Sequence, residues 1–103
     1  MIEITTLQRT FEDCALSRAR LQTSIISKTG NIDTAFFSFH SHFAALYNLS
    51  LPNDELRTIP QDDGNLIEQV SQWLSSAKNK KDAERGGLLF ERFTRALTSV
   101  GLL

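Results

Sequence analysis

The side chains most able to do chemistry in this chain include two histidines, His40 and His42, which lie inside an apolar stretch of residues 32–51. On a strand, residues two apart share a face, so the pair could bind one metal ion together. On a helix the two side chains point roughly 200° apart and cannot share a ligand. No further cluster of cysteine, histidine or acidic residues lies nearby in the sequence to complete a site. The sequence therefore predicts no metal and no other cofactor.

Cys14 and the adjacent carboxylates Glu12 and Asp13 are the remaining candidates for catalysis. The cysteine falls on an apolar seam, where a small buried thiol is the usual role, and no neighbouring residue favours its thiolate. Adjacent carboxylates on a helix diverge, which is poor geometry for paired acid and base catalysis. The sequence contains no phosphate-binding loop, dinucleotide-binding fingerprint, nucleophile elbow or zinc-protease motif. We therefore predict that the protein is not an enzyme.

The apolar stretch of residues 32–51 is expected to form the centre of the core, because it holds four of the seven phenylalanines and the only tyrosine. A helix places most of its large side chains on one side and its serines opposite, whereas a strand of this length would be unusual. Asp33 is expected to cap this helix just after Gly30 and Asn31. The stretch predicts a helix over residues 32–49.

Residues 3–28 carry apolar side chains that step by three and four, the heptad spacing of a packed helix. Thr5 or Thr6 could cap this helix, and Gly30 ends it. Arg18 interrupts the seam. Either its aliphatic stem lies along the edge of the core while the guanidinium reaches water or a carboxylate, or it fixes the register of helix pairing. The seam residues are Ile4, Leu7, Phe11, Cys14, Arg18, Leu21 and Ile25.

Two further apolar stripes predict helices over residues 65–78 and 83–101, and Trp73 falls on the buried side of the first. Gly86 and Gly87 lie inside the second stripe. Either that helix begins only after them, or close backbone packing against a neighbour offsets their poor helix propensity.

Residues 51–64 are expected to form one longer ordered loop, with a possible helical turn after Pro52 and with Asp62 or Asp63 starting the next helix. Short connections elsewhere imply antiparallel neighbours. The sequence thus predicts an all-α fold, a four-helix, mostly antiparallel bundle that forms a single domain over residues 1–103.

The totals indicate a soluble globular protein, with 41% hydrophobic residues and a net charge of −1. That net charge favours neither a nucleic-acid-binding nor a membrane-surface protein. One cysteine excludes an internal disulfide and indicates a reducing compartment. No secretory signal is visible, and no apolar run approaches the ~18 residues of a membrane span. We predict a cytoplasmic location.

Three apolar residues fall off the helical stripes and indicate a surface that meets a partner: Phe37, Leu88 and Leu102. We therefore expect a non-enzymatic protein-interaction module, such as an adaptor, a chaperone-like or immunity-type protein, or a regulatory subunit. Self-association into a homo-oligomer is its simplest form. On this interpretation Phe37→Asp leaves the fold intact and abolishes partner binding.

The uneven charge distribution supports an alternative, a nucleic-acid-binding accessory protein. Residues 51–77 carry one basic and five acidic residues, whereas residues 78–103 carry six basic and three acidic residues. Such a basic segment could contact phosphates, although its three interleaved carboxylates argue against it. The six basic residues are Lys78, Lys80, Lys81, Arg85, Arg92 and Arg95.

Overall fold

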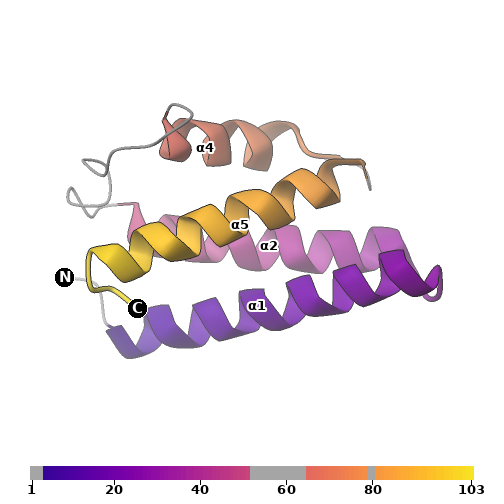
Figure 1. Cartoon of the computed structure of the whole chain (residues 1–103), viewed down its shortest axis with the longest axis horizontal. Coiled ribbons are helices and arrows are strands. Elements are labelled where there is room, and N and C mark those ends of the chain that lie inside the picture. The colour runs from indigo at the N-terminus through magenta and orange to yellow at the C-terminus, as the bar shows by residue number, and fades with distance from the viewer. Residues whose placement is uncertain (1–3, 52–64, 79–80) are drawn as a thin grey trace.

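The computed structural model describes residues 4–51, 65–78 and 81–103. Within these ranges it contains four helices and no strand, so the prediction of an all-α, four-helix bundle is confirmed (Figure 1). The expected turn after Pro52 and the expected role of Asp62 or Asp63 lie outside the described residues. The helices are α1 (Ile4–Ser27), α2 (Ile32–Ser50), α4 (Leu66–Ser76) and α5 (Lys81–Ser99).

The helices run mostly antiparallel to their neighbours. α1 and α2 pack closely along their lengths and are joined by the short turn of residues 28–31. α5 runs antiparallel to α4, because the Trp73 Nε1–H donates to the carbonyl of Asp82 at 3.1 Å while Arg92 donates to Gln69 at 3.1 Å. α5 lies across the middle of the bundle, between α4 and α1 (Figure 1).

Two of the expected helix starts are wrong. Asn31, and not Asp33, is the N-cap of α2, since its side-chain oxygen accepts a backbone N–H at 3.1 Å. Asp33 lies inside the first turn, where a negative charge is favourable beside the positive end of the helix dipole. Thr5 and Thr6 cannot cap α1, because the helix has already begun at Ile4.

An aromatic cluster forms the centre of the core, as the sequence predicted for the stretch that became α2. Phe43 is fully buried, and its ring centroid lies 5.3 Å from that of Trp73, 5.6 Å from that of Phe90 and 5.7 Å from that of Phe93. These rings come from α2, α4 and α5, so a single side chain joins three helices. Their tilted and edge-on arrangement is the geometry that aromatic pairs prefer.

The glycine pair lies inside α5, and a neighbouring side chain lies close to the backbone at each of the two positions. A Cβ atom on Gly86 would overlap the ring of Trp73, with the Cε2 atom only 2.9 Å away. A Cβ atom on Gly87 would lie 3.2 Å from an Arg18 guanidinium nitrogen. Close packing therefore offsets the low helix propensity of glycine, which was the second of the two expectations.

None of the helices in the described ranges is long and apolar enough to cross a membrane.

Candidate functional site

After the exposed Ile4, the heptad seam of α1 alternates between buried and partly buried side chains. Leu7, Cys14 and Leu21, seven residues apart, are buried. The seam residues between them, Phe11 and Arg18, are partly buried and contact α5: the ring of Phe11 stacks on Phe90 at 5.6 Å, and Arg18 pairs with Glu91. The seam therefore positions a row of side chains, rather than a closed core layer, at the boundary between α1 and α5.

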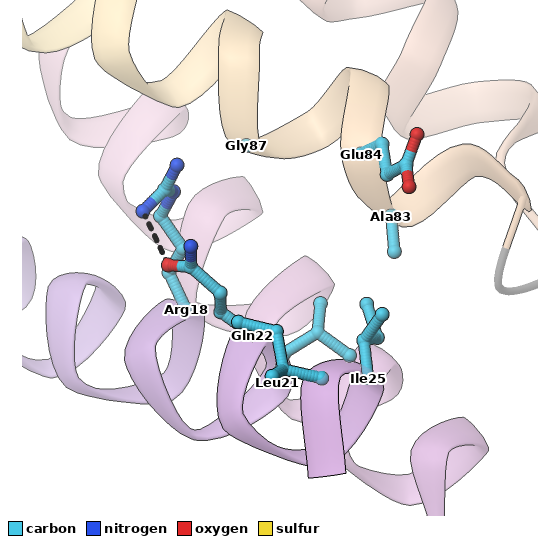
Figure 2. Close-up of a pocket in the computed structure, with 8 residues that line it drawn as sticks. Arg18, Leu21, Gln22, Ile25, Ala83, Glu84 and Gly87 are labelled. Carbon is cyan, nitrogen blue, oxygen red and sulfur yellow. Dashed lines mark hydrogen bonds between the residues drawn. The ribbon is translucent and has the colours of Figure 1, made fainter. Parts of the chain in front are cut away.

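An open groove separates α1 from α5 beyond this ring pair. Leu21 and Ile25 form its α1 side, and α5 places the small residues Ala83 and Gly87 opposite them, with Glu84 beside them (Figure 2). Because Ala83 and Gly87 lack long side chains, the space between the helices stays unfilled and has a volume of about 260 Å³. We call it the α1–α5 groove, lined by Arg18, Leu21, Gln22, Ile25, Ile26, Ala83, Glu84 and Gly87.

Arg18 closes one end of the groove. Its guanidinium donates to Glu91 on α5 at 2.7 Å and to Gln22 at 3.3 Å, and it packs against the bare backbone of Gly87. The Nε atom is buried and has no hydrogen-bond partner. This arrangement agrees with an aliphatic stem along the core edge and a head group that reaches a carboxylate.

The other end of the groove opens toward the turn between α1 and α2. A second hollow continues it there, lined by Ile25, Lys28, Ile32, Lys81 and Glu84. Lys28 has a φ of 53°, so the chain turns sharply just after α1. The groove is therefore an apolar channel with charged residues at its open end.

Ile26 at the rim of the groove is the feature that the sequence analysis missed. Its side chain is 73% exposed, the highest value among the large hydrophobic residues of the described ranges. The signal was the pair Ile25–Ile26, because a helix can turn only one of two adjacent side chains toward the same neighbour. An exposed isoleucine therefore borders the unfilled apolar groove.

The three residues predicted to bind a partner do not form one surface. Phe37 and Leu88 are 67% and 55% exposed, as their off-stripe positions required. They lie on α2 and α5, and Leu88 occupies the side of α5 opposite Phe90 and Phe93, the residues that contact α2. Leu102 is partly buried, because the chain turns back after α5 and packs this side chain against the core, and its role in binding a partner stays a prediction.

The basic residues predicted for the nucleic-acid alternative lie on α5 and just before its start. Lys81, Arg85 and Arg95 are exposed on that helix, while Arg92 is half-buried and donates to Gln69. Lys78 is exposed before it, and Lys80 lies outside the described residues.

Both histidines lie on α2, and the helix points their side chains in different directions, as the helical interpretation predicted. The His40 Nε2 atom lies 3.0 Å from the carbonyl oxygen of Leu74, and its ring packs on Trp73. The His42 Nδ1 atom is buried without a hydrogen-bond partner. The described ranges contain no group of three or more histidine, cysteine or acidic residues that could hold a metal ion.

Burial raises the pKa of the Cys14 thiol to about 12. We therefore expect the folded protein to resist a thiol reagent at pH 8, where only about one thiol in ten thousand would be ionised. Unfolding in guanidinium should expose the thiol and allow complete reaction within minutes. Rapid labelling of the folded protein would contradict the burial of Cys14.

The raised pKa of Cys14 also predicts that the stability of the protein depends on pH. The folded-state pKa lies above the ordinary value of 9.0, so the neutral thiol contributes its stability fully below about pH 9. This contribution falls as the pH rises toward about 12, because the unfolded state then gains a thiolate that the folded core excludes. Cys14→Ala should flatten this part of the stability curve, measured by urea unfolding at several pH values.

No protein-family model matches this chain, and no curated protein or solved structure matches it either.

Proposed function

We propose that the chain is a non-enzymatic helical protein-interaction module that binds another protein at the α1–α5 groove. One observation carries the proposal: an unfilled apolar groove lies beside Ile26, a large hydrophobic residue that is mostly exposed. A partner helix could insert an apolar side chain between Ile25 and Ala83 and cover Ile26 at the rim. Burying these apolar surfaces would remove them from water and so stabilise the complex.

The chemistry of the groove supports binding rather than catalysis. Its floor is aliphatic, and the Arg18 guanidinium is already engaged by Glu91 and Gln22. Cys14 is buried in the core and is not among the lining residues. The buried free thiol also supports the cytoplasmic location that forms part of this proposal.

The proposal predicts that Ile26→Asp abolishes partner binding without unfolding the protein. Affinity purification from the native host, analysed by quantitative mass spectrometry, would compare the proteins retained by the wild type and by the variant. Leu16→Asp is the matched control, because Leu16 is also on α1 and 52% exposed but does not line the groove. Ile26→Asp should lose a partner that Leu16→Asp keeps, and loss in both or neither would contradict the proposal.

A second variant fills the groove instead of charging its rim. Ala83→Leu places a larger side chain where the Ala83 methyl group already points toward Ile25 (Figure 2). If the added groups occupy the groove, the variant should remain as stable as the wild type and should still lose the partner. Phe37→Asp tests the separate prediction that α2 binds a partner, because Phe37 lies outside the groove.

A further inference from the structure

The outward face of α2 carries no charged side chain after its first turn. Asp33 is exposed in that turn, and no aspartate, glutamate, lysine or arginine follows it within the helix. The outward face of α1, by contrast, exposes Arg9, Glu12, Asp13 and Arg20, as a helix side that meets only water usually does. The exposed uncharged residues of α2 are Thr34, Phe37, Ser38, Ser41, Ala45 and Asn48, and we call them the neutral face of α2.

Phe37 is the one large side chain of this face. It is 67% exposed, and the positions about one turn before and after it hold the smaller residues Thr34 and Ser41. The rest of the bundle covers the other sides of α2, where its phenylalanines contact rings of α4 and α5 while α1 packs along its length (Figure 1). The described helices therefore leave the ring of Phe37 mostly in water, which is unfavourable for so large an apolar group.

The neutral face is complementary to a second copy of itself. When two identical helices cross antiparallel about a twofold axis, a residue lies opposite the one that is equally far beyond the axis in the other copy. An axis at Ser41 therefore places Phe37 opposite Ala45 and Thr34 opposite Asn48. A large side chain meets a small one on both sides of the axis, and the threonine hydroxyl can donate to the asparagine amide oxygen.

We propose that the chain forms a twofold-symmetric dimer through the neutral face of α2, with Ser41 on the axis. A residue close to such an axis lies close to its own copy, so a charge there would repel its like. The neutral face has no charge, which suits this occupant. The small side chain of Ser41 also allows the two helices to approach to the about 8–10 Å of packed helices. Because the side-chain sizes match about Ser41, a second copy is sufficient to cover Phe37.

This dimer goes beyond the proposed function and uses a different surface. The neutral face lies on α2, whereas the α1–α5 groove is lined by residues of α1 and α5. Ile26→Asp tests the groove and should leave the dimer intact, whereas Phe37→Asp should break the dimer and leave the groove intact. Failure of one proposal can therefore be told from failure of the other.

Sedimentation equilibrium of the full chain at several concentrations measures the dimer. A single pair of helices buries less than the about 1,200–2,000 Å² of a stable interface, so we expect a dissociation constant of about 10–100 μM. The wild type should then be mostly monomeric at about 1 μM and mostly dimeric at about 1 mM. Unfolding experiments at about 1 μM or below report on the monomer.

Phe37→Asp should remain monomeric at about 1 mM, because its carboxylate would lose water in an apolar contact without gaining a partner. Leu16→Asp is the matched control, since Leu16 is a 52% exposed apolar residue of α1 and the substitution makes the same change in charge. This control should dimerise like the wild type. Circular dichroism of both variants checks that the helices are retained.

Cysteine substitution locates the axis. Facing Cα atoms of packed helices lie within about 4–6 Å, a separation that a disulfide can span. Ser41→Cys should therefore form a disulfide-linked dimer rapidly under oxygen, because this residue lies opposite its own copy. Thr34→Cys should cross-link at least about tenfold more slowly, because its two copies would lie about 21 Å apart along the helix. Cys14 is buried in both variants, so they differ only in the introduced thiol.

The proposal is overturned if the wild type stays monomeric at about 1 mM, or if Phe37→Asp dimerises as tightly as the wild type. It is also overturned if Ile26→Asp abolishes the dimer, because the groove would then form the interface. Cross-linking of Thr34→Cys as fast as Ser41→Cys would contradict the position of the axis and overturn the proposed pairing.

Discussion

Replacing Phe43 with alanine is expected to destabilise the protein by about 3–5 kcal/mol, the range found for large aromatic residues removed from a core. Phe43 is fully buried and contacts rings from α4 and α5 as well as Phe39 in its own helix. Its loss would leave a cavity where three helices meet, and rigid neighbouring rings can fill such a space only partly. Urea unfolding followed by circular dichroism measures the change.

Phe37→Ala provides the matched comparison, because it deletes the same groups from the same helix. Phe37 is mostly exposed, so its removal should change the free energy of unfolding by no more than about 0.5 kcal/mol. Equal losses for the two variants would show that Phe37 is part of the core. That result would remove the basis for treating Phe37 as a surface residue.

Gly86→Ala is expected to destabilise the protein, although alanine is the better helix former by about 1 kcal/mol. The added methyl group would overlap the six-membered ring of Trp73. That ring cannot move aside easily, because its N–H donates to the carbonyl of Asp82 and it packs on Phe36 and Phe43. Overpacking of this kind typically costs about 1–3 kcal/mol, so we expect a net loss measurable by thermal or urea unfolding.

Gly87→Ala tests the same reasoning one residue later. The nearest atoms to its new methyl group belong to the far end of Arg18, which can shift by a few tenths of an ångström. The gain in helix propensity should then nearly balance the cost, leaving the stability within about 1 kcal/mol of the wild type. A larger loss for Gly87→Ala than for Gly86→Ala would contradict the packing described for α5.

The sequence was sufficient for the helices because their evidence is local. The apolar stripes predicted four helices close to their observed bounds, and the phenylalanine-rich stretch became the centre of the core. Helix starts were less predictable, because Asn31 and Asp33 are both good capping residues. Only the backbone conformation decides which of them accepts the first free N–H, and it selected Asn31.

The groove could not be predicted from the sequence, because it results from small residues on α5 that leave space opposite α1. Ala83 and Gly87 look like ordinary small residues of a helix until Leu21 and Ile25 are placed opposite them. The ion pair between Arg18 and Glu91 could not be predicted for a related reason, since the two residues lie 73 positions apart in the sequence. Both features depend on how α1 and α5 meet.

The position of Trp73 allows α4, the shortest of the described helices, to be followed by fluorescence in solution. It is the only tryptophan of the chain, and its indole is enclosed by aromatic side chains from α2 and by the backbone of α5 at Gly86. Its fluorescence emission therefore reports on the packing of α4 against α2 and α5. If α4 detached while the rest of the bundle stayed folded, the emission would shift to longer wavelength before most of the helical signal was lost. Intrinsic fluorescence can thus follow the α4 interface without an added label.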